Sequence, residues 1–99
     1  MLLEFKQSLT FDWDGGNILK NLLKHKVGYL ECEEVFGDPC KVIFRDVLHS
    51  DKETRYILVG KTRQDRSLYL VFTLRGKKIR VISARDLSRK ERYFYEKSN

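Results

Sequence analysis

The stretch LYLVFTLRGKKIRVISAR, residues 68–85, carries the strongest structural signal in this chain of 99 residues. Two runs rich in β-branched, aromatic and leucine residues flank Gly76, which can adopt the positive φ angle that a tight hairpin turn needs. The pattern predicts a β-hairpin with Gly76-Lys77 as its loop. Because strand side chains alternate between faces, one face would hold Leu70, Phe72, Leu74, Ile79 and Val81, and the other Thr73, Arg75, Lys78 and Arg80 beside Val71 and Ile82. The first face would belong to the core, and the second would be a basic surface.

Size and composition predict one folded domain over residues 1–99. Apolar residues make up 41% of the chain, and only one Pro and six Gly occur, which argues against disorder or low complexity. No apolar run approaches the roughly 18 residues of a membrane span, and the N-terminal segment lacks the apolar region of a signal peptide. Cys32 and Cys40 have neither zinc-binding nor redox spacing. We therefore expect a cytoplasmic protein without a membrane segment, a metal site or a cofactor.

Positive charge is concentrated in the second half of the chain. Residues 1–50 contain 6 Lys or Arg against 8 Asp or Glu, residues 51–99 contain 14 against 6, and the net charge of the whole chain is +6. Such asymmetry indicates a polyanionic partner, with nucleic acid first and an acidic protein second. A generic basic surface is the alternative.

The N-terminal third predicts short strands followed by a helical hairpin. Residues 2–5 and 9–13 show the alternation of short strands, the second of them at a sheet edge. Asp12 or Asp14 can cap the helix that follows, whose apolar stripe comprises Ile18, Leu19, Leu22, Leu23 and Val27, while Asn17, Lys20, Asn21, Lys24 and His25 lie largely off it. Gly28 would break this helix, and a second short helix would end at Gly37-Asp38-Pro39.

From Cys40 onward the apolar period changes to two. KVIFRDV and RYILVGK precede the hairpin, and the turn-rich stretches HSDKE and TRQDRS separate the strands, so an antiparallel meander is the simplest topology. Ser88 and Glu91 form a capping box for a final helix, whose inward face would hold Leu87, Glu91, Phe94 and Tyr95. The prediction is an α+β domain with two N-terminal helices, an antiparallel sheet of about four strands and a C-terminal helix, with the helices on one face and the basic face open.

Seven short blocks, in a consistent order and spacing, resemble a known family across nearly the whole chain. They are Phe11-Asp12-Trp13-Asp14; Asn21-x-x-Lys24-His25-x-Val27; Val35-Phe36-x-Asp38-Pro39; Glu53-x-Arg55-Tyr56-x-x-x-Gly60; Val71-Phe72-Thr73-x-Arg75-Gly76; Ile79-Arg80-Val81-Ile82-Ser83-Ala84-Arg85; and Glu91-Arg92-x-x-Tyr95-Glu96. On these blocks the chain resembles the BrnT toxins of bacterial type II toxin–antitoxin pairs, which look like relatives of the RelE-type ribonucleases.

The resemblance implies a RelE-like fold and an endoribonuclease that cleaves RNA without a metal ion and inhibits translation. A cognate antitoxin with a ribbon-helix-helix DNA-binding domain, similar to the BrnA antitoxins, would neutralise the toxin. Operator DNA would be contacted mainly through that antitoxin complex. A non-catalytic basic module that binds RNA or its antitoxin is the alternative.

Metal-free RNA cleavage needs a base for the 2′-OH, cations around the crowded phosphorane and an acid for the leaving 5′-oxygen. Arg80 and Arg85 are the first choices for holding phosphate, because a guanidinium group offers two parallel donors and stays charged. Strict alternation places them on opposite faces, so they share a site only if the strand bulges or ends near Ser83-Ala84. The alternatives are a solvated strand charge for Arg80 and an ion pair with Asp86 or Glu91 for Arg85.

The sequence leaves the general base open among His25, Lys24 and Glu53. Histidine titrates near neutral pH, but His25 at a helix end is equally suited to interact with the helix dipole. Glu53 can act as base or orient Arg55, with a local ion pair as the alternative, and Lys24 can neutralise phosphate or act as acid. His49, in a turn between strands, is expected to be structural or inert.

Further contacts with RNA are predicted for Tyr56, Arg75, Lys78, Ser83 and Tyr95. Tyrosines can stack on unpaired bases, although packing of the last helix is the alternative for Tyr95. The arrangement of the cations discriminates between the two functions. If Lys24, His25, Arg55, Arg80 and Arg85 surround one concavity, catalysis is favoured, whereas scatter over opposite faces favours binding alone.

Overall fold

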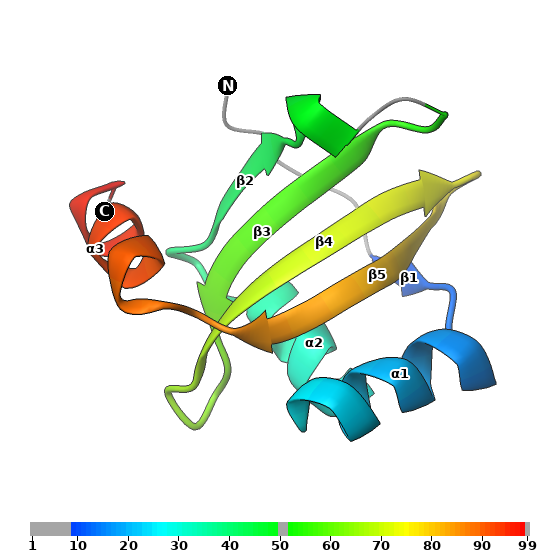
Figure 1. Ribbon diagram of the computed structural model, residues 1–99, viewed down its shortest axis with the longest axis horizontal. Coiled ribbons are helices and arrows are strands. Elements are labelled where there is room, and N and C mark those ends of the chain that lie inside the picture. Colours follow the sequence, from blue (N-terminus) through cyan, green and yellow to red (C-terminus); the bar gives the residue numbers. More distant parts are fainter. Residues whose placement is uncertain (1–8, 50–51, 99) are drawn as a thin grey trace.

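The computed structural model describes residues 9–49 and 52–98, arranged as in Figure 1, so the strand predicted for residues 2–5 lies outside the described part. The strands are β1 (Thr10–Phe11), β2 (Val42–Arg45), β3 (Arg55–Lys61), β4 (Ser67–Arg75) and β5 (Lys78–Asp86). The helices are α1 (Gly15–His25), α2 (Tyr29–Phe36), the 3-10 turn η1 (Val47–His49) and α3 (Arg89–Ser98). Within the described residues one sheet has the order β1-β5-β4-β3-β2. The α+β class is confirmed.

The strands from β2 to β5 form the predicted antiparallel meander. The fifth strand is β1, which lies within the edge strand predicted for residues 9–13 and pairs parallel to the beginning of β5. The hairpin is confirmed in its register, since Arg75 pairs with Lys78 and Thr73 with Arg80. Gly76 has a φ angle of 63°, the left-handed conformation that glycine adopts without steric cost.

A β-bulge in β5 changes which side chains share a face. Phe72 pairs with Val81 but Val71 pairs with Ser83, so Ile82 is an extra residue with no direct partner on β4. One inserted residue shifts the alternation by one position. Arg80, Ser83 and Arg85 therefore emerge on the same face of the sheet. The bulge that the sequence required for the two arginines to share a face is present.

Helix α1 lies along the edge of β5 that β1 leaves uncovered (Figure 1). Asn17 Nδ2 donates to the carbonyl oxygen of Val81 at 3.2 Å, and Asn21 Oδ1 accepts from the backbone N–H of Ala84 at 3.0 Å. Both asparagines are buried. Their side chains satisfy backbone groups that a sixth strand would otherwise pair, because buried peptide groups must find hydrogen-bond partners.

Three leucines of the predicted apolar stripe consequently face away from the sheet, while Ile18 is half-buried and Val27 is buried. Leu19, Leu22 and Leu23 are exposed, whereas Asn17 and Asn21 face the sheet. The periodicity marked the helix correctly, and Asp14 caps it by accepting from Asn17 N–H at 3.1 Å. The backbone groups at the free edge of β5 need hydrogen-bond partners, and this need determines which side of α1 faces the sheet.

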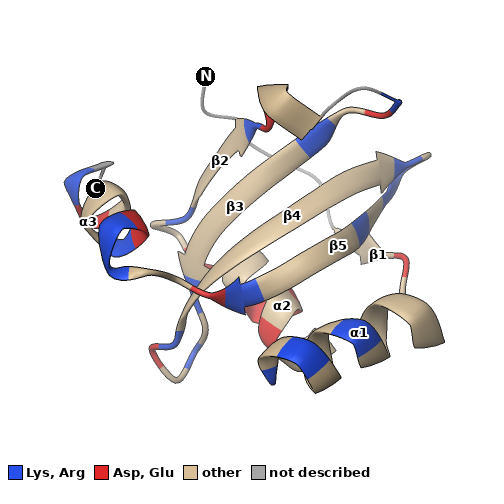
Figure 2. Ribbon diagram, viewed as in Figure 1, with Lys and Arg blue, Asp and Glu red and all other residues tan. Residues whose placement is uncertain are grey.

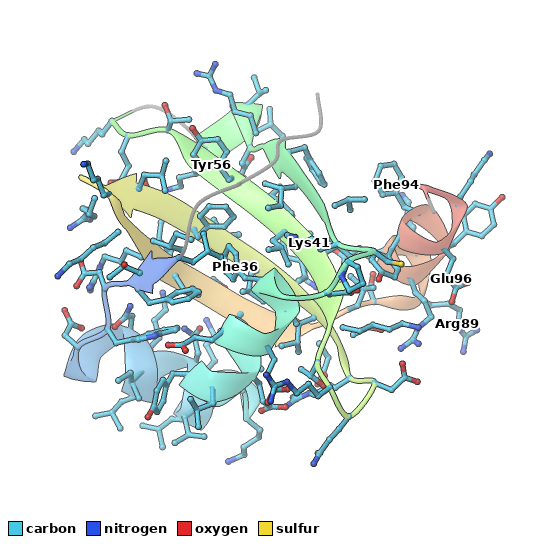
Figure 3. The ribbon with its side chains drawn as sticks, turned by 180° about the vertical axis from the view of Figure 1, so that it is seen from behind. Phe36, Lys41, Tyr56, Arg89, Phe94 and Glu96 are labelled. Carbon is cyan, nitrogen blue, oxygen red and sulfur yellow. The ribbon has the colours of Figure 1, made fainter. Side chains whose placement is uncertain are left out.

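The main core lies between α2 and the back of the sheet. Phe36 and Tyr56 both contact Phe72, with ring centroids 5.1 and 5.4 Å away, and Figure 3 shows this side of the sheet from behind. Gly60 permits the close approach of α2, because a Cβ atom there would lie 3.2 Å from the carbonyl oxygen of Val35. Gly60 in the Arg55–Gly60 block thus has a packing reason.

Helix α3 packs against the other face, so the expectation that all helices lie on one face is wrong. Leu87 and Tyr95 join a second apolar cluster with Ile57 and Val59. The ring of Phe94 contacts Phe44 at 6.2 Å but remains half exposed. The predicted capping box is present, since Ser88 Oγ accepts from Glu91 N–H and Glu91 Oε1 accepts from Ser88 N–H. Part of the sheet face opposite α2 is thereby covered by α3, and the rest of that face stays open.

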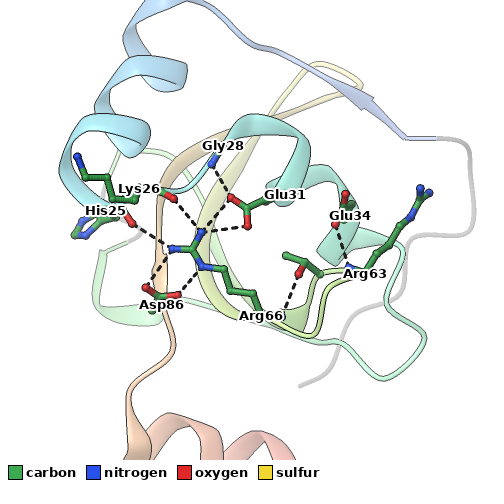
Figure 4. Close-up of polar contacts among 9 residues, drawn as sticks. His25, Lys26, Gly28, Glu31, Glu34, Arg63, Arg66 and Asp86 are labelled. Carbon is green, nitrogen blue, oxygen red and sulfur yellow. Dashed lines mark hydrogen bonds and ion pairs between the residues drawn. The ribbon is translucent and has the colours of Figure 1, made fainter.

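Arg66 links the α1–α2 turn to the end of β5 through hydrogen bonds (Figure 4). Its guanidinium donates to the carboxylates of Asp86 and Glu31 and to the carbonyl oxygens of His25 and Lys26. The hydrogen bond to Asp86 is the main reason that the pKa of Arg66 is raised. The C-terminal end of α1 is therefore held beside Asp86.

Candidate active site

A row of three side chains crosses the sheet on the face opposite α2, which we call the front face. Arg55 on β3 and Arg80 on β5 flank Thr73 on β4, since each of the two pairs directly with Thr73. Thr73 is buried, and its hydroxyl donates to the carbonyl oxygen of Thr54 at 2.8 Å. Neighbouring strands lie about 4.8 Å apart, which puts the two arginine backbones about 10 Å apart. That separation lets both side chains reach one phosphate group.

A cleft of about 230 Å³ opens beside this row, between the sheet and the first half of α1. We call it the arginine cleft; it is lined by Gly16, Asn17, Lys20, Glu53, Arg55, Arg75, Arg80, Val81 and Ile82. Four of these side chains are cationic and one is a carboxylate. Figure 2 shows Lys and Arg at the hairpin ends of β3, β4 and β5 and along α1. A concave surface with this charge favours an anion.

Arg80 is held in place by two aspartates. Its Nη1 lies 3.0 Å from an Asp14 oxygen and 3.6 Å from an Asp12 oxygen. The hydrogen bond to Asp14 raises the pKa of Arg80, and the same bond lowers the pKa of the Asp14 carboxyl. Both contacts use Nη1, and the Arg80 side chain lines the arginine cleft. The side chain is thus charged and oriented before any ligand arrives.

Glu53 is the carboxylate of the arginine cleft. It lies 3.9 Å from Arg55 and 3.5 Å from Arg75. These are long contacts for partly exposed groups, and each contributes little to stability. They do place a proton acceptor among the cations.

A second cleft, of about 330 Å³, adjoins the first. It is lined by Leu48, His49, Lys52, Glu53 and Arg55, so Glu53 and Arg55 line both. His49 Nδ1 lies 3.0 Å from an Asp46 carboxylate oxygen. A histidine that donates Nδ1–H to a carboxylate has Nε2 directed outward for proton transfer. This contact makes His49 a candidate acid or base, a role that sequence reasoning did not assign to it.

The other predicted catalytic residues lie towards the opposite end of β5. Lys24 and His25 form the last turn of α1, beyond the half that lines the arginine cleft, and His25 lies near Asp86. Arg85 shares the front face with Arg80 but is five residues further along the strand, on the order of 15 Å. The structure therefore brings together Glu53, Arg55 and Arg80, and separates them from Lys24, His25 and Arg85.

Arg85 has strong partners of its own. Its two terminal nitrogens donate to the two carboxylate oxygens of Glu91 at 2.7 Å each, and its guanidinium lies 4.1 Å from the centroid of the Tyr69 ring. The hydrogen bond from Arg85 lowers the pKa of Glu91 to about 2. This ion pair ties α3 to β5 and is the alternative that the sequence left open for Arg85.

We expect Glu91→Gln to lower the free energy of unfolding by about 1 to 2 kcal/mol at pH 7. The Glu91 pKa is lowered on folding, so the ion pair stabilises the protein above the ordinary value of 4.5, and this stabilisation is lost as the pH falls towards about 2. Urea unfolding at several pH values measures the difference. Asp65→Asn, in the exposed Lys61–Asp65 pair, serves as control and should change stability by less than about 0.5 kcal/mol. A Glu91→Gln effect that persists undiminished at pH 2 would contradict the assignment.

The predicted RNA contacts divide into two groups. Arg75, Lys78 and Ser83 lie on the front face with Arg80, according to the strand register. Tyr56 lies on the back face, stacked on Phe72. Tyr95 lies on the buried side of α3, and its hydroxyl donates to Asp38 at 2.9 Å. Both rings pack within the fold, which for Tyr95 is the alternative that the sequence left open.

Lys20, which lines the arginine cleft, and Asp46, which is the partner of His49, did not follow from sequence reasoning. Lys20 lies one helical turn before Lys24, and this spacing could have suggested a shared flank of α1. Asp46 precedes His49 by three residues, which in a tight turn suffices for a hydrogen bond. Neither signal indicates that these groups lie near Arg55 and Arg80. That proximity depends on how the strands β2 to β5 are ordered in the sheet.

Within residues 9–49 and 52–98 no group of three or more His, Cys, Asp and Glu side chains is placed to hold a metal ion. No helix in the described part has the length and apolar character needed to cross a membrane.

Comparison with known proteins supports the resemblance seen in the sequence. No curated protein matches the chain. A family model described as the ribonuclease toxin, BrnT, of type II toxin–antitoxin systems matches residues 13–91. This match spans the arginine cleft, the second cleft that His49 lines, and the hairpin. It covers well over half of the chain. The chain therefore belongs to the BrnT family of ribonuclease toxins of type II toxin–antitoxin systems.

Proposed function

We propose that this protein is an endoribonuclease that cleaves RNA without a metal ion and thereby inhibits translation. The observation that carries the proposal is the row of Arg55, Thr73 and Arg80 beside the arginine cleft. Arginines that converge on a concavity supply the positive charge that a phosphorane requires, which is the role that a metal ion has in other nucleases.

The residues of the two clefts can supply a general base, charge stabilisation and a general acid. The Glu53 carboxylate removes the proton of the ribose 2′-OH, and the 2′-oxygen then attacks the neighbouring phosphorus. Arg80 and Arg55 stabilise the negative charge of the phosphorane. His49, oriented by Asp46, donates its Nε2 proton to the 5′-oxygen as the P–O5′ bond breaks. The products are a 2′,3′-cyclic phosphate and a free 5′-hydroxyl.

The front face suggests a path for the RNA strand on either side of the scissile phosphate. Ser83 and Arg85 continue along β5 on the same face as Arg80, and Arg75 and Lys78 lie at the hairpin end. Lys24 lies along the flank of α1 that carries Lys20. Phosphate contacts of this kind hold the backbone in place without reading its sequence.

In the cell, we propose that a cognate antitoxin neutralises the toxin in the cytoplasm. This antitoxin would carry a BrnA-like ribbon-helix-helix domain, and operator DNA would be bound through the antitoxin in the complex. The proposal rests on the family and on the excess positive charge of the second half of the chain.

We expect the purified, antitoxin-free protein to cleave single-stranded RNA at the same rate in EDTA as in its absence. In the same assay His49→Ala should reduce the rate by about a hundredfold, because general acid catalysis contributes at least that much. His25→Ala is the matched control, since its imidazole lies beyond the arginine cleft, and it should reduce the rate by less than about threefold.

The EDTA response and the two variants distinguish metal-free cleavage from metal-dependent cleavage and from RNA binding without turnover. Cleavage lost in EDTA and restored by a divalent cation would contradict the metal-free mechanism. A larger loss in His25→Ala than in His49→Ala would transfer the acid role to His25. RNA binding without turnover in every preparation would favour the non-catalytic binding module.

A further inference from the structure

Helix α1 presents an apolar face to solvent. Leu19, Leu22 and Leu23 are 53%, 43% and 70% exposed. With 3.6 residues per turn they occupy one side of the helix, opposite Asn17 and Asn21. An amphipathic helix normally buries this side, so its exposure marks a surface that is covered when a partner binds.

The fold leaves the helix no other orientation. Asn17 and Asn21 hydrogen-bond to Val81 and Ala84, and turning the leucines inward would leave those backbone groups unpaired. The apolar surface continues into α2, where Tyr29 and Leu30 are also exposed. The ring of Tyr29 contacts Trp13 at 5.7 Å, which places the first turn of α2 beside the segment that leads into α1.

The charges on α1 itself are positive, and the carboxylates beside its C-terminal end, Glu31 and Asp86, are already paired with Arg66. Lys20 and Lys24 lie along one flank of the leucines, Lys26 caps the helix and α1 itself contains no acidic residue. A second copy of the chain would bring lysines against lysines. RNA has no apolar surface that would match three leucines. The complementary partner is an amphipathic protein segment with an acidic margin.

We propose that this leucine face of α1 is the docking site of the antitoxin, through an acidic amphipathic segment that lies along the helix. The identity of the partner rests on the proposed toxin–antitoxin function. Lys20 belongs both to the flank of this face and to the lining of the arginine cleft. A segment bound on α1 therefore reaches the edge of the cleft, where its carboxylates compete with phosphate for the cations.

The test measures binding of the purified full-length antitoxin from the same operon to full-length toxin by isothermal titration calorimetry. Leu19→Glu/Leu23→Glu should raise Kd by at least a hundredfold, because it removes apolar contacts and adds charges of the partner's sign. Leu19→Lys/Leu23→Lys should raise Kd by about tenfold only, and Leu19→Met/Leu23→Met by less than threefold. Tyr93→Ser is the matched surface control, since Tyr93 is 67% exposed on α3, away from α1 in Figure 1.

Two further readouts separate this proposal from the proposed function. RNA cleavage by the free variants should equal that of the wild type, and the glutamate variant should inhibit growth even when antitoxin is co-expressed. Wild-type affinity in a folded glutamate variant would overturn the docking site, and so would a lysine variant that binds more weakly than the glutamate variant. A wild-type dimer at micromolar concentration that the glutamate variant dissociates would identify a second copy as the occupant and overturn the proposal. Absence of RNA cleavage by wild type counts against the proposed function alone.

Discussion

Replacing Arg80 by alanine is expected to lower the rate of RNA cleavage by about a thousandfold and to abolish growth inhibition. Arg80 is held by Asp12 and Asp14 and lines the arginine cleft. Removing one preorganised group that stabilises transition-state charge costs about a hundredfold to a thousandfold. We expect the upper value because the guanidinium also orients the phosphate through paired donors. Single-turnover cleavage of a fluorescent RNA measures the effect.

Two control variants distinguish a catalytic role of Arg80 from an effect on folding. Arg80→Lys keeps a positive charge beside Asp14 but loses the paired donors, and it should recover less than a tenth of the wild-type rate. Arg63→Ala removes an exposed arginine on the α2 side of the molecule, where Arg63 N–H donates to Glu34 (Figure 4), and should leave cleavage unchanged. A folded Arg80→Ala protein that cleaves RNA at the wild-type rate would remove Arg80 from the chemistry.

Replacing Asn21 by leucine should lower the free energy of unfolding by about 3 kcal/mol. The change makes α1 more apolar, and a rule based on hydrophobicity alone would predict stabilisation. The side chain is buried, however, and its loss leaves the N–H of Ala84 without the acceptor that it has at 3.0 Å. An unpaired buried donor costs about 1 to 3 kcal/mol, and the loss of the second bond, from Asn21 Nδ2 to Asn17 O, brings the total to the upper end. Urea denaturation measures this difference.

The reverse substitution on the exposed face is the control. Leu23→Asn should change the free energy of unfolding by less than about 0.5 kcal/mol, close to the difference in helix propensity. If Asn21→Leu proved neutral while Leu23→Asn destabilised the protein, the orientation of α1 would be wrong. The docking surface inferred from that orientation would then have no basis.

The hairpin and the helix ends followed from local chemistry. Gly76 between two β-branched runs determines the turn, and with it the pairing of Thr73 with Arg80. Asp14 and Ser88 cap their helices because their side chains accept the free N–H groups of the first turn. These features depend on residues a few positions apart, so they are readable from a single sequence.

The composition of the site was only partly predictable. Glu53, Arg55 and Arg80 were expected together and do line one cleft. The predicted partnership with Lys24 and His25 does not appear there, because Arg66 holds the end of α1 near Asp86. His49 was expected to be structural or inert, and the structure places it in a cleft with Glu53 and Arg55. Each of these differences arises from contacts between residues more than twenty positions apart or from the packing of a turn against the sheet.

The sequence by itself determined the secondary structure, the family and the excess of positive charge on the last three strands. Only the tertiary structure decided which faces these elements present. Periodicity measures how apolar residues repeat, but it cannot show that the free edge of β5 needs the polar side of α1. Alternation likewise cannot show that Ile82 is the extra residue of a bulge. Those two outcomes, set by the pairing of buried backbone groups, place Arg80, Ser83 and Arg85 on one face and the leucines of α1 in solvent.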